Sequence, residues 1–319
     1  MRTPTPDAAV GIMLPRDLPA ADVLTYARRA EALGFDELWV VEDLGFRGGI
    51  AQAAAVLAAT ERIVVGIGIL PAAVRTAAFA AMELGTLAEL FPGRVHAGVG
   101  HGMPEWMRGL GVWPASPLTL LDEYLDALRS LLSGEETTRA AGRYVQVDAL
   151  RLETPPRVIP PLLAGVRGPR SLELAGRIAD GAILAEPVTP EYLARARAQM
   201  VTPGRVVAYN VAAVADDPAA ARATARPALE WIGEPDWAPH IEPLPFAEEF
   251  ARLRERSADR AAFVRDLPDE WVDRLAVVGT PDAARARIAE LHAAGAASIV
   301  LMPAGTDAVA AMEALARVL

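Results

Sequence analysis

The fold of this chain is decided by residues 63–102, which read IVVGIGILPAAVRTAAFAAMELGTLAELFPGRVHAGVGHG. Two short apolar runs, Ile63–Ile69 and Arg94–Val99, flank one long helical pattern, and both runs carry glycines near their ends. Apolar residues continue along each run without polar alternation, which is typical of buried parallel strands. In α/β proteins, ligands bind at the carboxyl ends of such strands. The stretch therefore predicts two neighbouring strand ends that face a ligand.

Strand and helix patterns alternate on both sides of this stretch. Eight strands, each followed by a helix, predict an α/β (β/α)8 TIM barrel, and a doubly wound open sheet is the alternative. The other predicted strands are Val10–Leu14, Glu37–Val41, Pro161–Val166, Gly181–Ala185, Arg205–Val214 and Ser298–Met302. The predicted helices are Asp22–Leu33, Gly48–Thr60, Thr76–Leu90, Pro117–Leu132, Ser171–Ala179, Pro190–Met200, Pro281–Ala294 and Thr306–Leu319.

Two segments interrupt this alternation. Residues 134–156 form an excursion in which Tyr144–Val147 could pair as a small hairpin. Residues 216–273 are rich in Glu, Arg, Trp and Pro and are mostly helical by pattern. They predict a helical insertion before the last strand, within a single domain that spans residues 1–319.

Composition excludes several classes of protein. The 319 residues are 52% hydrophobic, with a net charge of −10 and no block of Lys or Arg, so no nucleic-acid partner is expected. Cysteine is absent, which excludes disulfides, thiolate metal sites and a cysteine nucleophile. The N-terminal MRTPTPDAAV lacks the apolar core of a signal peptide, so a cytoplasmic protein without a membrane partner is expected. No HExxH, HxH or paired-carboxylate metal motif and no GxSxG motif occurs.

Three glycine-containing strand ends are candidate binding sites. At residues 66–71, Gly68 could supply an unusual backbone and Ile69 could support a flat ring, or the strand could be a plain one that Pro71 ends. At residues 98–102, the pattern is not GxGxxG; His101 could be catalytic, or could only bond to its surroundings. At residues 165–170, glycine and arginine before a helix could bind an anion, or could form an ordinary Gly-Pro turn.

Other side chains carry weaker signals. Glu42 and Asp43 follow the second strand, where Asp43 could orient a substrate or relay a proton, or could cap a loop. Aromatic residues could form apolar walls around a ring, although most aromatics are plain core; they are Phe46, Trp106, Trp113 and Trp231. His96 lies within a strand and is predicted to be a packed core residue.

Six blocks of sequence, in this order, resemble the bacterial luciferase-like monooxygenase superfamily. The resemblance covers most of the chain outside 216–273 and is closest to the actinobacterial branch with deazaflavin (coenzyme F-420)-dependent oxidoreductases. The blocks are GIMLP (11–15), AEALGFDELWVVED (30–43), IVVGIGILP (63–71), TLAELFPGRVHAGVGHG (86–102), GVRGPRSLELAGRIADGAIL (165–184) and AVVGTPDAARARIAELHAAGA (276–296).

The resemblance implies a barrel that holds a deazaflavin, or alternatively FMN, at its C-terminal mouth. In such relatives the third strand carries a bulge behind the ring, often with a non-prolyl cis peptide, which maps here to Gly68-Ile69. The fourth strand end would flank the ring, and the fifth strand turn would hold the phosphate. The implied cofactor-binding residues are Gly68, Ile69, Leu70, Val99, Gly100, Gly165, Val166, Arg167, Gly168 and Pro169.

The chain also departs from these relatives. The deazaflavin-dependent sugar-phosphate dehydrogenases carry a histidine after the acid of the second strand and a glutamate near position 101. Here Leu44 follows Asp43, and position 101 is histidine. Sugar-phosphate oxidation is therefore not expected. His101 and Asp43 are the candidate catalytic residues, with His101 as a proton donor to a carbon that has received hydride.

The resulting hypothesis is an oxidoreductase that transfers hydride from reduced coenzyme F-420 to a C=C or C=N bond. The alternatives are a two-component monooxygenase that uses reduced FMN and O2, and a non-catalytic flavin-binding relative. A small-molecule or modified-peptide substrate would contact Phe46, Trp106 and Trp113, and residues 103–116 and 216–273 would select it. A homodimer is expected, with helices 48–60 and 76–90 as candidates for the interface.

Overall fold

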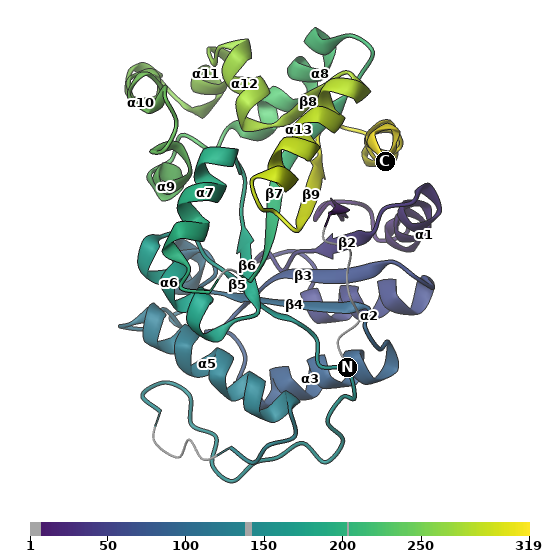
Figure 1. Cartoon of the computed structure of the whole chain (residues 1–319), viewed down its shortest axis with the longest axis vertical. Coiled ribbons are helices and arrows are strands. Elements are labelled where there is room, and N and C mark those ends of the chain that lie inside the picture. Colours follow the sequence, from purple (N-terminus) through teal and green to yellow (C-terminus); the bar gives the residue numbers. More distant parts are fainter. Residues whose placement is uncertain (1–7, 138–141, 203) are drawn as a thin grey trace.

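Eight parallel strands close into a barrel in the computed structural model, which is described for residues 8–137, 142–202 and 204–319 (Figure 1). The order around the barrel is β1-β2-β3-β4-β5-β6-β7-β9, and β6–β7 pairing completes the ring. The prediction of a TIM barrel is confirmed. The strands are β1 (Ala9–Met13), β2 (Glu37–Val40), β3 (Val64–Pro71), β4 (Val95–Gly100), β5 (Leu162–Gly165), β6 (Gly181–Leu184), β7 (Arg205–Val214), β8 (Val277–Gly279) and β9 (Ser298–Pro303).

Helices follow the strands and cover the outside of the barrel. Several begin where the sequence places a hydroxyl residue before a proline, because the side chain accepts a backbone N–H of the first turn. The helices are α1 (Val23–Leu33), α2 (Gly49–Ala59), α3 (Ala77–Leu90), α4 (Pro104–Gly109), α5 (Pro117–Leu132), α6 (Pro169–Ile178), α7 (Pro190–Gln199), α8 (Pro218–Ala225), α9 (Ala238–Ile241), α10 (Ala247–Arg256), α11 (Arg260–Arg265), α12 (Asp269–Leu275), α13 (Pro281–Ala293) and α14 (Ala308–Leu315). Three short 3-10 turns lie at Arg226–Leu229, Pro235–Trp237 and Ala316–Val318.

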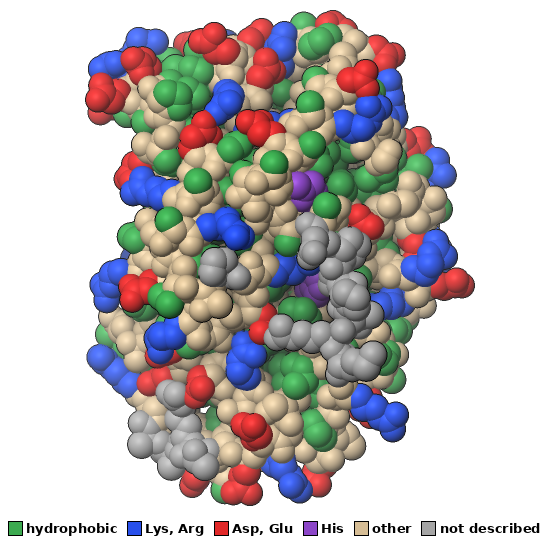
Figure 2. Space-filling model, in the orientation of Figure 1, with side chains coloured by type: hydrophobic (Ala, Val, Ile, Leu, Met, Phe, Trp, Pro, Cys, Tyr) green, Lys and Arg blue, Asp and Glu red, His purple; other side chains and the backbone are tan. Residues whose placement is uncertain are grey.

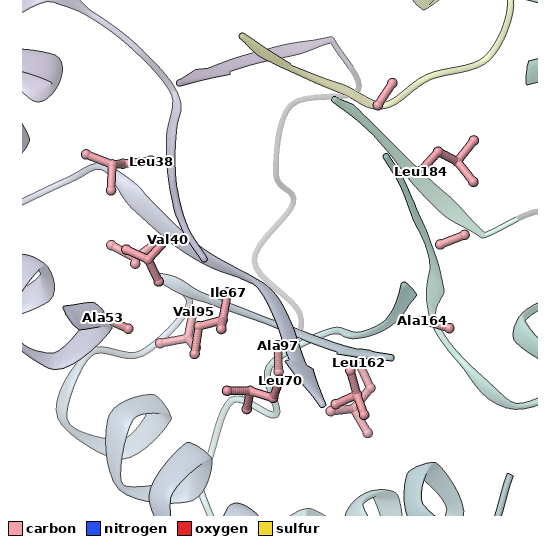
Figure 3. Close-up of a cluster of buried hydrophobic side chains, with 14 of the residues drawn as sticks. Leu38, Val40, Ala53, Ile67, Leu70, Val95, Ala97, Leu162, Ala164 and Leu184 are labelled. Carbon is pink, nitrogen blue, oxygen red and sulfur yellow. The ribbon is translucent and has the colours of Figure 1, made fainter. Parts of the chain in front are cut away.

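The apolar core has three parts. The largest lies between the strands and the outer helices, and Figure 3 shows a portion of it that includes Leu38, Ile67 and Leu162. The second belongs mostly to residues 225–278 and reaches β7. The third fills the barrel interior, where Trp39, Tyr209 and Val300 meet. Alternate residues of a strand thus serve different parts of the core.

Two of the sequence predictions need correction here. Among the described residues, Tyr144–Val147 forms no strand; the N–H groups of Arg143, Tyr144 and Val145 donate to the Glu123 carboxylate at 2.8–2.9 Å, which takes the donors a strand partner would need. A ninth strand, β8, pairs with the end of β7 just before α13, where no strand was predicted.

The insertion is helical, as predicted. Residues 216–273 contain α8 to α11 and most of α12, and most of these helices gather at one end of the molecule in Figure 1, whereas α9 lies beside α7. The prediction of one domain over residues 1–319 stays a prediction, and its residues 1–7, including most of the N-terminal stretch, lie outside the described residues.

A buried ion pair ties together the amino ends of three strands. Glu37, Arg205 and Ser298 are the first residues of β2, β7 and β9. The Glu37 carboxylate, fully buried, accepts from Arg205 at 2.6 Å, from the Ser298 hydroxyl and from Trp39 Nε1 at 2.8 Å. Buried charge is tolerated when it is paired and hydrogen-bonded. This base of the barrel lies at the end opposite the predicted site.

Two buried histidines predict a pH-dependent stability. Burial lowers the pKa of His96 to about 4 and that of His240 to about 3. Both are neutral in the folded protein, while in the unfolded chain they bind protons below about pH 6.5. The free energy of unfolding therefore has its full value above that pH. It decreases as the pH falls, by about 2 kcal/mol per histidine at pH 5. Urea unfolding between pH 7 and 5 measures this loss, and His240→Asn should flatten the slope; an unchanged slope would contradict the account.

Acidic and basic side chains are interspersed over the face in Figure 2, with no block of one sign. No helix of the described residues is both long and apolar enough to cross a membrane. Within residues 8–137, 142–202 and 204–319, no group of three metal-binding side chains occurs.

Candidate active site

Ile69, near the carboxyl end of β3, occupies space that three glycines of the neighbouring strands leave open. These glycines are Gly98 and Gly100 of β4 and Gly165 of β5. The β3–β4 register shifts between Ile67 and Leu70, and the Gly68-Ile69 peptide is cis, so the implied bulge and cis bond are both present. A Cβ on Gly165 would lie 2.6 Å from Ile69 Cγ2, and one on Gly98 would lie 2.2 Å from the Ile67 carbonyl oxygen. The glycines are therefore required by close packing around the bulge.

The neighbouring side chains point away from this place. Leu70, Val99 and Val166 are buried in the outer core between strands and helices. Ile69 instead packs against the interior cluster and is only partly buried. Leu70, Val99 and Val166 can thus offer backbone atoms to a cofactor, whereas Ile69 offers its side chain.

Tyr209 lies directly beneath the bulge, although no feature of the sequence pointed to this residue. Its hydroxyl would lie 2.4 Å from a Cβ on Gly68. The side chain is 5% exposed, and the hydroxyl has no hydrogen-bond partner among the described residues. Burial raises the pKa of Tyr209 well above its usual value. A neutral hydroxyl without a partner is therefore available beside the predicted ring position.

His101 follows β4 and contacts the start of α6. Its Nε2 lies 3.2 Å from the Ser171 hydroxyl. Burial lowers the pKa of His101, with a hydrogen bond to the backbone of Pro117 acting in the opposite direction. The structure thus brings His101 to the predicted phosphate turn and keeps the neutral form favoured. A neutral imidazole is a weak acid, so this environment suits hydrogen bonding better than proton donation.

The β5–α6 turn has the geometry of an anion site. Gly168 is the N-cap of α6 and Pro169 its first residue, so first-turn amides and the positive end of the helix dipole face the turn. The Arg167 guanidinium lies 4.4 Å from the centre of the Trp237 ring, and the Arg167 carbonyl accepts from the Tyr192 hydroxyl at 3.1 Å. The insertion therefore holds Arg167 in place, while Arg170 is exposed.

The two acids after β2 have separate partners. Glu42 pairs with Arg75 at 2.7 Å and accepts from the Gly49 N–H at 2.7 Å, which fixes the start of α2. Asp43 pairs with Arg16 at 2.7 Å, and Arg16 lies over the Phe46 ring at 4.9 Å. Of the two carboxylates, Asp43 is the one joined to the loop after β1.

The structure does not gather the predicted aromatic wall into one cluster. Phe46 is 48% exposed after β2, whereas Trp106 and Trp113 are partly buried on and after α4. No ring contact joins these three within the described part of the chain. Trp231 lies in the insertion, under the Arg260 guanidinium.

Glu186 is a second residue that the sequence reading missed. It follows β6, is partly exposed, and is joined to Pro187 by a cis peptide. Desolvation raises the pKa of its carboxyl, and the Asp43 charge adds to this, whereas Arg167 and Arg16 oppose it. An acidic residue directly before proline carries little signal in a single sequence, because it reads as an ordinary turn.

The amino-acid sequence is similar to those of known proteins. A family model described as luciferase-like monooxygenase matches residues 5–298. The 5,10-methylenetetrahydromethanopterin reductase of Methanolobus tindarius is 28% identical over 297 residues, which cover 88% of this chain and 90% of that protein.

Two solved structures share the fold. The coenzyme F420 dependent tetrahydromethanopterin reductase from Methanopyrus kandleri has a TM-score of 0.81, with 22% identity and 97% of each chain covered. A type II Baeyer-Villiger monooxygenase component from Pseudomonas putida, in complex with FMN, has a TM-score of 0.73 with 17% identity, over 98% of this chain and 96% of that one. The family match extends over most of the sequence and includes every strand end described above. The chain belongs to the luciferase-like monooxygenase family of oxidoreductase enzymes.

Proposed function

We propose that this enzyme uses reduced coenzyme F-420 to reduce a C=C or C=N bond of an organic substrate. The observation that carries the proposal is the glycine-lined bulge around Ile69, next to a helix N-terminus suited to phosphate. The similarity to an F420-dependent glucose-6-phosphate dehydrogenase of Microbacterium testaceum, 33% identical over 53% of this chain, supports a deazaflavin as the coenzyme. When bound, the reduced deazaflavin would supply the hydride.

The residues present fit such a coenzyme. Glycines at 98, 100 and 165 keep the strand ends free of side chains, so a flat ring could rest against Ile69. The Tyr209 hydroxyl below Gly68 lacks a partner in the described residues. Gly165, Gly168 and the first turn of α6 would hold the phosphate, with Arg167 adding charge. These residues would bind and orient the coenzyme, and the barrel walls would exclude water.

His101 and Asp43 stay our candidates for polar groups on the substrate side. With coenzyme saturating, His101→Ala and Asp43→Asn are each expected to lower kcat by about tenfold or more, because each removes a positioned hydrogen bond or charge. Steady-state kinetics measures this. Unchanged turnover in both variants would contradict the assignment. Asp236→Asn, on the exposed side of the insertion, serves as a matched control.

The redox reaction itself is tested by anaerobic mixing. Reduced deazaflavin and the enzyme are combined with a panel of unsaturated acceptors, and coenzyme oxidation is followed by absorbance. Oxidation that needs both enzyme and acceptor supports the proposal. Oxygen-dependent turnover with reduced FMN alone would favour the two-component monooxygenase, and binding without turnover of either kind would favour a non-catalytic relative.

We also propose that the enzyme is a homodimer and acts on a small-molecule or modified-peptide substrate in the cytoplasm. The solvent face of α3 is unusually apolar: Phe79 is 64% exposed, Met82 51% and Leu90 64%. Large exposed apolar patches mark association surfaces. The mass in solution should be twice 33.8 kDa, and Phe79→Asp with Leu90→Asp should halve it. A monomeric wild type in light scattering would contradict the dimer.

A further inference from the structure

Glu186 lies at the carboxyl-end mouth of the barrel, on the side opposite Asp43. β6 and β2 stand opposite each other, because three strands separate them in either direction around the ring. Glu186 follows β6, and Asp43 follows β2. Even so, the charges of Asp43 and Arg16 act on the Glu186 carboxyl, and so does that of Arg167 from the β5 end. These charged groups follow β1, β2 and β5, so the Glu186 carboxyl shares the carboxyl-end mouth of the barrel with all three.

The backbone around Glu186 is held from two directions. Trp237 Nε1 of the insertion donates to the Glu186 carbonyl at 2.9 Å, and His240 Nδ1 lies 3.1 Å from the Pro187 carbonyl. The Val188 N–H donates to Asn210 Oδ1 of β7 at 3.0 Å. Because the backbone groups of Pro187 and Val188 are hydrogen-bonded as well, the main chain at Glu186 is fixed. The insertion thus acts as a clamp that fixes the backbone of Glu186 at the opening.

The surroundings of this carboxyl suit an acid better than those of His101 do. Desolvation is the largest effect on the pKa of Glu186 and raises it, despite Arg167 and Arg16 nearby. The pKa of His101 moves in the opposite direction. Asp43 is engaged by Arg16, and the pKa of the Tyr209 hydroxyl is raised well above its usual value. An acid whose pKa lies near the pH at which the enzyme works is the most efficient proton donor.

We propose that Glu186 donates the proton that completes the reduction, a role that rests on the proposed function above. The reduced coenzyme would supply the substrate carbon with a hydride, which is one proton with two electrons. The electron pair of the π bond moves to the adjacent carbon or nitrogen, which takes the proton from Glu186. The carboxylate that remains regains a proton from water before the next turnover. No further oxidant or reductant is required.

The substitution Glu186→Gln tests this role, because it keeps the shape of the side chain and removes its proton. Glu173→Gln, on the exposed face of α6, is the matched control. Single-turnover oxidation of reduced deazaflavin by an accepted substrate should slow by about 100-fold or more in Glu186→Gln. The dissociation constant of the coenzyme should stay the same in both variants.

A second readout needs neither coenzyme nor substrate. Infrared titration of the coenzyme-free protein should show one carboxyl group that keeps its proton above the ordinary glutamic acid value of about 4.3. That signal should be absent from Glu186→Gln and present in Glu173→Gln. Wild-type rates in Glu186→Gln, or no carboxyl above the ordinary range, would overturn the role of Glu186. Failure of the wild type to bind deazaflavin would overturn the proposed function instead, and the titration separates these failures.

Discussion

Gly98→Ala is expected to weaken deazaflavin binding by about tenfold or more and to destabilise the fold. The new Cβ would lie 2.2 Å from the Ile67 carbonyl oxygen and 2.5 Å from Ile183 Cδ1. Backbone cannot yield as a flexible side chain can, so β3 would have to move where the bulge begins. Overpacking of this kind costs about 1–3 kcal/mol, and 1.4 kcal/mol is a factor of ten in affinity. Coenzyme titration and urea unfolding measure the two effects.

A double-mutant cycle separates the role of Ile69 from general damage to the fold. A Cβ on Gly165 would meet Ile69 Cγ2 at 2.6 Å, whereas one on Gly109 of α4 would meet nothing within 4 Å. Gly165→Ala should therefore weaken binding, and Ile69→Ala should partly restore the stability that Gly165→Ala loses, so the two changes are non-additive. Gly109→Ala is the control and should bind the coenzyme normally. Additive effects would show that Ile69 does not fill this space.

Glu37→Ala is expected to lower the free energy of unfolding by about 3–5 kcal/mol, because it leaves Arg205, whose side chain is only 14% exposed, without its carboxylate. Its control, Glu313→Ala, breaks the exposed pair with Arg29 and should cost about 1 kcal/mol or less. Denaturant unfolding measures both.

The double change Glu37→Leu with Arg205→Met should recover most of the loss, since it removes both charges together. A loss for Glu37→Ala as small as that for Glu313→Ala would contradict the role given to this ion pair.

The fold was predictable because the strands and helices alternate with clear boundaries. Runs such as Ile63–Ile69 are apolar enough to indicate buried strands, and Thr280 before Pro281 marks a helix start. The hairpin at Tyr144–Val147 was wrong because a distant carboxylate, Glu123, binds the backbone there. β8 was missed because three residues are too few to show a pattern.

The site was predictable only where backbone geometry leaves a trace in sequence. Glycines at the strand ends indicated the bulge at Gly68-Ile69 and the turn at Gly168. Tyr209 and Glu186 could not be found in the same way, because their importance depends on what lies across the barrel. A tyrosine within an apolar strand and a glutamate before proline look ordinary until the ring of strands closes. The clamp on Glu186 by the insertion likewise exists only in three dimensions.

The central claim is that the bulge around Ile69 and the turn before α6 hold a deazaflavin. Equilibrium titration of the purified wild type with coenzyme F-420 and, separately, with FMN tests it most directly, with Gly98→Ala as the comparison. We expect saturable binding of coenzyme F-420, tighter than that of FMN and weakened by Gly98→Ala. Saturable FMN binding without any binding of coenzyme F-420 would contradict the account.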